Sequence, residues 1–174
     1  DGEQTPPEIG HIIHRLIRAE LNADDPYADV KERSTRAALE LYPRLRARVA
    51  AAKDPLACAV RVAIAGNVLD FAIADGHRHM QALWSTTETM LSQPLAIDDT
   101  ERLRARLNEV DRVLYLADNA GETVFDRVLI ETLDRPTRYA VKGGPVLNDA
   151  TDDDAEAAGI DGVAEIVETG SRAP

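Results

Sequence analysis

The feature that most constrains the fold is an alternation of strand-like and helix-like segments in the second half of the chain. Residues 113–117 form a short, continuous apolar run, which is typical of a strand buried on both faces of a sheet. The segments that follow are patterned as helix at 123–133, strand at 137–141, helix at 152–158 and strand at 162–168. Because strands joined by a helix and short links run parallel, we predict a parallel sheet in an α/β layer.

The first half of the sequence is predicted to be helical. Apolar residues recur at helical spacing from Pro7 onward, and a second helical run covers residues 30–52, which Pro43 is expected to end or kink. A third helix should follow, with Asp54 as its N-cap and Pro55 as its first residue. These patterns indicate a helical part that precedes the sheet.

The change of pattern divides the chain into two predicted parts. We expect a mainly helical N-terminal subdomain at residues 1–98 and a Rossmann-like, three-layer α/β/α part with a parallel sheet at 99–174. The second part should open with a capped surface helix at 99–109. The segment around Trp84 has no pattern that assigns it. Three strands make only a small open sheet, so we expect an incomplete α/β fold to which further βα units belong.

Composition excludes several classes of function. The net charge of −11, from 31 acidic and 20 basic side chains, disfavours binding to nucleic acid or to an anionic membrane. The single cysteine, Cys58, excludes a disulfide within the chain and a cysteine-based zinc site, and its apolar surroundings predict a buried structural thiol. One thiol, no signal-peptide pattern and no apolar run of about 18 residues favour a cytoplasmic protein.

Polar clusters follow two successive predicted strands at their carboxyl ends. Asp118, Asn119 and Glu122 follow the first strand, whereas Lys142 and Asp149 follow the second. Ligands of open parallel sheets bind beyond these ends, so neighbouring strands would turn both loops toward one crevice. Two carboxylates and an amide oxygen, from Asp118, Asn119 and Asp149, suit Mg²⁺, Mn²⁺ or a similar ion. Lys142 could neutralise the charge of a phosphate.

Other interpretations of these residues remain open. An Asp-Asn-x-Gly sequence is also a common turn, and the Asn-Asp pair that ends in Asp149 is also an ordinary helix N-cap. Asn67 and Asp70 are polar residues in an apolar stretch, which either staple the helical part or reach the crevice. The histidines are interpreted as surface features, at positions His11, His14, His77 and His79. The chain contains no Walker A loop, no Gly-x-Gly-x-x-Gly and no nucleophile-elbow serine.

A set of motifs in a fixed order runs along nearly the whole chain. These motifs are Asp25-Pro-Tyr, Ala65-Gly-Asn-Val-Leu-Asp-Phe, Leu116-Ala-Asp-Asn-Ala-Gly-Glu-Thr-Val-Phe-Asp, Lys142-Gly-Gly-Pro-Val-Leu-Asn-Asp-Ala-Thr and the stretch from Ala158-Gly-Ile-Asp to Glu168-Thr-Gly. In this order they resemble the damage-control phosphatases, a family formerly catalogued as a domain of unknown function and typified by carbohydrate-phosphate phosphatases. The resemblance implies metal-dependent hydrolysis of phosphate monoesters of small metabolites, including damaged ones, which is a form of metabolite repair.

The resemblance also implies roles for individual residues. Metal ligands fall on Asp118, Asn119 and Asp149, and Lys142 looks like a phosphate contact. Among the remaining matched positions, Asn67 lies near the substrate, Glu122 is a further substrate-side acid, and Asp126 has either a similar or a structural role. Family members continue further toward the C-terminus with another Lys-Gly loop, and many begin with a cysteine motif that is absent here. The chain therefore resembles a C-terminally truncated member.

Two alternatives compete with the phosphatase hypothesis. One is a non-catalytic module that binds a metal or a phosphometabolite and needs a missing segment. The other is a methyltransferase-type enzyme on a Rossmann-like sheet, which the absence of a glycine-rich cofactor loop disfavours. The partner expected under the leading hypothesis is a small phosphorylated metabolite, together with a homo-oligomer or a complementing C-terminal segment. The ligand set accepts Mg²⁺, Mn²⁺, Co²⁺ or Ni²⁺.

Overall fold

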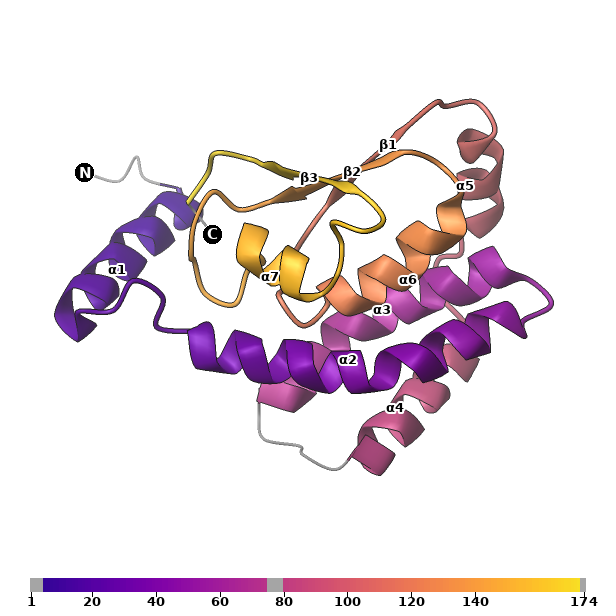
Figure 1. The fold of residues 1–174 in the computed structure, drawn as a ribbon, viewed down its shortest axis with the longest axis horizontal. Coiled ribbons are helices and arrows are strands. Elements are labelled where there is room, and N and C mark those ends of the chain that lie inside the picture. The colour runs from indigo at the N-terminus through magenta and orange to yellow at the C-terminus, as the bar shows by residue number, and fades with distance from the viewer. Residues whose placement is uncertain (1–4, 75–79, 173–174) are drawn as a thin grey trace.

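The computed structural model describes residues 5–74 and 80–172 of the 174-residue chain. Its elements are α1 (Pro6–Leu21), α2 (Ala28–Ala50), α3 (Pro55–Ala74), α4 (Met80–Ser92), α5 (Thr100–Leu107), β1 (Val113–Leu116), α6 (Thr123–Leu133), β2 (Thr137–Val141), α7 (Asp152–Ala157) and β3 (Glu165–Glu168). Figure 1 shows α2, α3, α4, α6 and α7 below the three strands, with α1 at the left and α5 at the right. His77 and His79, and the side chain of Asp70, lie outside the described residues.

The helices begin where their capping residues indicate. The Asp54 carboxylate accepts a hydrogen bond from the backbone amide of Ala57 at 3.0 Å, so Asp54 caps α3 as predicted, with Pro55 as the first residue. The expectation that Pro43 ends its helix is wrong, because α2 continues through it to Ala50. Leu41 and Leu45, on either side of Pro43, are fully buried, and this packing outweighs the cost of an interior proline.

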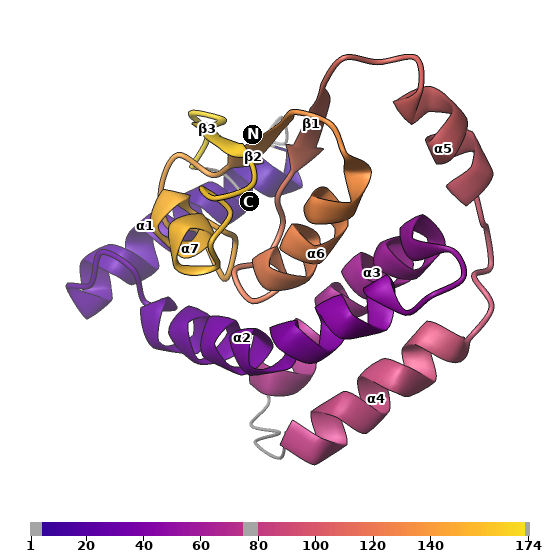
Figure 2. The same ribbon diagram turned by 45° about the vertical axis from the view of Figure 1, so that its right-hand side comes forward.

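The sheet has the predicted parallel topology. Its strand order is β1-β2-β3, and both pairs are parallel, with Val113 opposite Thr137 and Arg138 opposite Glu165. The burial expected for both faces of β1 is wrong, since Leu114 and Leu116 are 63% and 69% exposed. Figures 1 and 2 show α2, α3, α6 and α7 on one side of the sheet, and the opposite side carries these two leucines. The described residues thus form a helical part and one covered sheet face, in keeping with an incomplete α/β fold.

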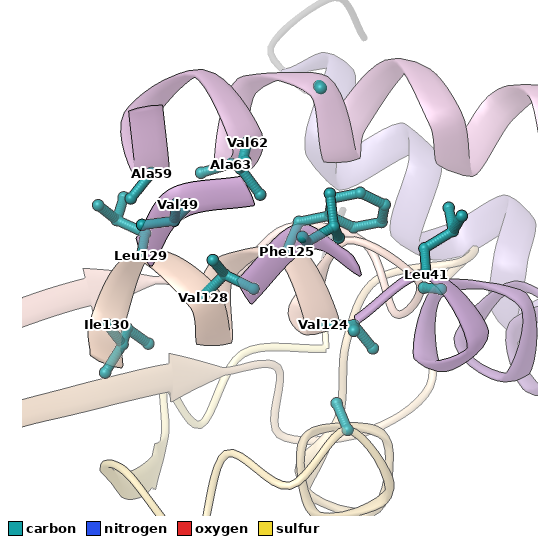
Figure 3. Close-up of a cluster of buried hydrophobic side chains, with 14 of the residues drawn as sticks. Leu41, Val49, Ala59, Val62, Ala63, Val124, Phe125, Val128, Leu129 and Ile130 are labelled. Carbon is teal, nitrogen blue, oxygen red and sulfur yellow. The ribbon is translucent and has the colours of Figure 1, made fainter. Parts of the chain in front are cut away.

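One continuous apolar core joins the helical part to the sheet. It runs from α2 and α3 through α6 to β2 and α7. Figure 3 shows Phe125 and Val128 of α6 facing Val62 and Ala63 of α3, with Leu41 beside them. The division at residue 98 stays a prediction. Among the described residues no helix combines the length and the apolar character that a membrane crossing requires.

A buried lysine ties α2 to α7. The ammonium of Lys31 lies 2.8 Å from a carboxylate oxygen of Asp25 and 2.6 Å from one of Asp154, and the Lys31 side chain is 4% exposed. Asp154 also accepts hydrogen bonds from the amide and hydroxyl of Thr151, which begin α7. Burial lowers the pKa of Lys31, but its bonds to Asp154 and Asp25 outweigh that effect and raise it. This triad fixes the end of the loop that carries Lys142 and Asp149.

Candidate functional site

The loops that follow β1 and β2 are joined through their backbones. The amide of Ala120 donates to the carbonyl of Asn148 at 2.9 Å, and the amide of Ala150 donates to the carbonyl of Asp118 at 2.7 Å. Asn119 and Asp149 are therefore opposite one another in an isolated antiparallel bridge. In a pair flanked by such bonds, rather than bonded directly, the side chains lie closest together on the same side. The sequence prediction that both loops share one crevice is confirmed by this geometry.

A network of amide groups surrounds the first of these loops. The Asn67 amide nitrogen, on α3, donates to carboxylate oxygens of Asp118 and Glu122, both at 3.3 Å. The Asn119 amide nitrogen donates to the same Glu122 oxygen at 3.2 Å. Because each of these amides donates through its nitrogen, the carbonyl oxygen of Asn119 is left as the end that can ligate a cation. Asn67 thus reaches the crevice, which was one of the two interpretations open to it.

Gly66 explains how α3 comes close enough for Asn67 to reach this network. A β-carbon added at Gly66 would lie 2.8 Å from Cβ and 2.9 Å from Cγ of Phe125, closer than real side chains approach. Phe125 is buried in α6, and Glu122 precedes that helix directly. The glycine therefore permits the close packing of α3 on α6 that places residue 67 beside residues 118 and 122.

The second loop supplies a cation and an acid. The Lys142 ammonium lies 3.3 Å from a carboxylate oxygen of Asp149. Burial raises the pKa of Asp149, the Lys142 charge opposes this rise, and the negative charge of Asp118 adds to it. A protonated His14, from α1, also acts to lower the pKa of Asp149. Asp149 is thus a buried acid that is paired with Lys142 and lies within electrostatic reach of Asp118.

Glu122 lies in a similar environment. Burial raises its pKa, the hydrogen bonds from Asn119 and Asn67 oppose the rise, and the Asp118 charge adds to it. Acids whose pKa is raised by burial and by each other's charge lack a full counter-charge when ionised, and a cation supplies one. Among the described residues no three His, Cys, Asp or Glu side chains are grouped closely enough to hold a metal. Asp118, Asn119 and Asp149 are the oxygen donors that the two loops carry, and they stay the predicted ligands of a divalent ion.

Asp126 lies beneath the loop rather than in it. Its carboxylate accepts hydrogen bonds from the hydroxyls of Tyr115 on β1 and of Tyr139 on β2, the latter at 2.6 Å. The side chain is 2% exposed. Burial raises the pKa of Asp126 to about 7, although both hydroxyl bonds favour the ionised form. Asp126 holds the start of α6 against both strands, which is the structural role considered for it.

Helix α1 makes contacts in this region that the sequence did not indicate. Arg18 donates from its guanidinium to the carbonyl of Pro145 at 3.3 Å, and the His14 ring lies 6.1 Å from the ring of Tyr27. His11 is hydrogen-bonded to the carbonyl of Arg172 at 2.8 Å. The prediction that His11 and His14 are surface features did not anticipate these contacts. The spacing of residues 11, 14 and 18 on one helix face was the available signal.

A cavity lies beside the two loops but is separate from their carboxylates. Its volume is about 570 Å³, and it lies between α2 and α7, where Lys31, Thr35, Leu39, Pro145 and Asp154 are among its lining residues. Neither Asp118 nor Asp149 is among the residues that line it. We place the candidate site at the loops, because the polar groups converge there and the Lys31 ammonium of the cavity is already paired with Asp25 and Asp154.

Comparison with known proteins connects this geometry to a family. The family model for the damage-control phosphatase ARMT1-like domain matches residues 1–174. An uncharacterised protein of Methanocaldococcus jannaschii, MJ0202, is 36% identical over 178 residues, which cover 98% of this chain and 58% of that protein. A damage-control phosphatase of Archaeoglobus fulgidus is 34% identical over 164 residues, covering 92% of this chain and 56% of the relative.

A solved structure shows the same fold. The crystal structure of a DUF89 family protein from Pyrococcus horikoshii, PH1575, superposes with a TM-score of 0.87 at 30% identity, covering 99% of this chain and 60% of that one. The chain thus spans about three-fifths of the length of the relatives it matches. The resemblance inferred from the ordered motifs is confirmed: the chain belongs to the damage-control phosphatase family, within its ARMT1-like domain.

Proposed function

We propose that this protein is a metal-dependent phosphatase that hydrolyses phosphate monoesters of small metabolites, including damaged ones. The observation that carries the proposal is the backbone bridge that sets Asn119 beside Asp149, with Asp118 adjacent in the chain. The relative from Archaeoglobus fulgidus bears the name damage-control phosphatase. Because this chain spans only about three-fifths of its relatives, the activity of the whole protein is itself part of the proposal.

The side chains of the site divide the chemistry among them. Asp118, Asn119 and Asp149 would hold a divalent cation, and Mg²⁺, Mn²⁺, Co²⁺ and Ni²⁺ all suit oxygen donors. When bound, such an ion supplies Lewis-acid polarisation of a phosphoryl oxygen and a water of lowered pKa. Lys142 would neutralise the charge of the phosphoryl group, because its ammonium lies 3.3 Å from the proposed metal ligand Asp149 and thus beside the site where the phosphate would bind.

Asn67 and Glu122 act on position rather than on charge transfer. The Asn67 amide donates to Asp118 and Glu122 together, so it holds the ligand and the neighbouring acid in one orientation. Glu122 accepts from the amides of Asn67 and Asn119, so its carboxylate is held in an orientation from which it can contact a substrate hydroxyl or a water. A fixed arrangement of this kind is what hydrolysis of a phosphate ester requires.

A non-catalytic module that binds a metal or phosphometabolite and needs a further segment is the second candidate. Two observations favour it: the chain spans about three-fifths of the length of its relatives, and Leu114 and Leu116 of β1 are exposed. The two candidates agree on the metal site and differ on turnover.

A metal series with p-nitrophenyl phosphate tests both candidates. We expect Mn²⁺ or another divalent ion to bind in a calorimetric titration and to support turnover, and Asp118→Ala to abolish both. Asp111→Ala is the matched control, because Asp111 is an exposed aspartate near the opposite end of β1. Binding without turnover would select the second candidate. Metal binding that survives Asp118→Ala would refute the site.

A further inference from the structure

Helix α1 is turned with its apolar face outward. The exposed fractions of its large apolar side chains lie between 36% and 60%, at Ile9, Ile13, Leu16, Ile17 and Leu21. The opposite face carries His11, His14 and Arg18, which are half-buried. An amphipathic helix ordinarily buries its apolar face against the protein. The orientation of α1 therefore places a basic face against the body of the molecule.

That basic face lies over the loop that carries Lys142. In Figure 1, α1 lies at the left, beyond the carboxyl ends of β2 and β3. Arg18 donates to the carbonyl of Pro145, three residues after Lys142. Arg172 approaches the same loop from the other end of the chain, and its Nε donates to the carbonyl of Gly143 at 3.0 Å. Two guanidinium groups are thus anchored on a loop of four residues.

Gly144 makes room for this arrangement. Its φ of +159° lies in a region that other residues rarely adopt, and a β-carbon there would lie 2.7 Å from Nε of Arg172. Each guanidinium has five N–H donors, and in the described part of the chain one of them is hydrogen-bonded to a loop carbonyl. Lys142, Arg18 and Arg172 form a group that we call the cationic rim.

The cationic rim extends along the loop beyond Lys142. Lys142 is the member that lies beside the proposed metal ligand Asp149, whereas Arg18 and Arg172 bond to the carbonyls of Pro145 and Gly143. Arg18 and Arg172 are further cations gathered in one place on a chain whose net charge is −11. Guanidinium groups are suited to carboxylates and phosphates, because their donors form a planar fork.

We propose that Arg18 and Arg172 bind a second anionic group of the substrate, so that the protein selects phosphate monoesters that also carry a phosphate or a carboxylate. The inference rests on the proposed function, since Lys142 and the metal ligands take the phosphate that is cleaved. The substrate class is therefore a small metabolite with two anionic groups rather than an uncharged sugar that carries a single phosphate.

Matched substrate pairs test this inference. Fructose 6-phosphate and fructose 1,6-bisphosphate differ by a second phosphate, whereas glucose 6-phosphate and 6-phosphogluconate differ chiefly by a carboxylate. We expect that, in at least one pair, the sugar derivative with the second anionic group binds the Mn²⁺-loaded chain about tenfold more tightly in calorimetry. Its KM should be lower by a similar factor. The pair that shows the difference identifies which anion the rim takes.

Variants separate this role from a structural one. Arg18→Gln keeps a donor for the Pro145 carbonyl and removes the charge. We expect it to abolish the preference within the pair, by raising the Kd and the KM of the member with the second anionic group to those of the member with one phosphate only. Arg15→Gln is the control, because Arg15 is an exposed arginine on the same helix. It should leave the preference intact.

The outcomes distinguish this inference from the proposed function. If neither pair is hydrolysed but the preference in binding exists and disappears in Arg18→Gln, the hydrolase proposal fails and the rim stands. If turnover occurs with equal KM within both pairs, or if Arg18→Gln weakens both members equally, the rim proposal is overturned and the hydrolase proposal stands. If none of the four sugar derivatives binds, the rim proposal is also overturned.

Discussion

Replacing Gly66 with alanine tests the packing that positions the site. The new β-carbon would lie 2.8 Å from Cβ of Phe125, roughly 0.7 Å inside the optimal separation of about 3.5 Å between carbon atoms. Cβ of Phe125 cannot rotate away, because it is fixed to the backbone of α6, so the two helices must separate. Overpacking of this kind costs about 1–3 kcal/mol, and alanine returns up to about 1 kcal/mol of helix propensity. We expect a net loss of about 1–2 kcal/mol in the free energy of unfolding.

A double-mutant cycle in urea isolates this contact. Phe125→Ala removes Cγ and Cδ2, which would lie 2.9 and 3.2 Å from the new methyl group, but keeps Cβ. The cost of Gly66→Ala should therefore fall in part, by about 1 kcal/mol, in that background. Metal affinity should fall with Gly66→Ala as well, because Asn67 moves away from Asp118 when the helices part. Costs that add within about 0.5 kcal/mol, or a Gly66→Ala chain as stable as the parent, would refute the close-packing argument.

Two further perturbations concern buried charges. Lys31→Met leaves Asp25 and Asp154 without their cation, so it should lower the free energy of unfolding, measured in urea, by about 3 kcal/mol. The control Lys53→Met, at an exposed position, should change it by less than about 0.5 kcal/mol. Equal effects of the two variants would show that the triad contributes nothing specific. Because the pKa of Asp126 rises from 3.8 to about 7 on folding, the native state binds this proton more tightly than the unfolded state, and stability should fall as pH rises between those values. At roughly 1.4 kcal/mol per pH unit the fall attributable to this group between pH 5 and pH 7 is about 3 kcal/mol. Asp126→Asn should remove it when both proteins are unfolded in urea with a chelator at pH 5 and pH 8, and identical pH dependence in the two would contradict the assignment.

The secondary structure of the second half followed from local signals. The helix predicted at 123–133 and the strand predicted at 137–141 have those bounds in the structure, because short links and apolar periodicity leave little freedom there. The segment around Trp84 forms α4, which no pattern assigned. Arg44 of α2 stacks over Trp84 at 3.9 Å from its ring centroid, so a residue remote in sequence helps to stabilise this helix. Contacts of this kind cannot be obtained from the periodicity of one segment.

The site was predictable in outline because topology alone brings the ends of neighbouring parallel strands together. The contacts that hold the site in place were not predictable from the sequence. The need for a glycine at position 66 depends on how close Phe125 lies, and the contact of Arg18 with Pro145 depends on the orientation of α1. Apolar periodicity predicted that α1 would be amphipathic, but it gave no information on which face the protein would cover. The roles proposed for the metal ligands stay predictions until metal binding is measured.

The uncovered leucines of β1 also determine how this chain will behave in the laboratory. Among the described residues β1 pairs only with β2, so its other edge offers unpaired backbone groups next to Leu114 and Leu116. An exposed strand edge with apolar side chains beside it is a template for association between molecules. Any polypeptide that shields it must present apolar side chains at every second residue along an extended stretch. Until such a polypeptide is supplied, colloidal stability rather than folding will limit the concentration at which the chemistry of this chain can be measured.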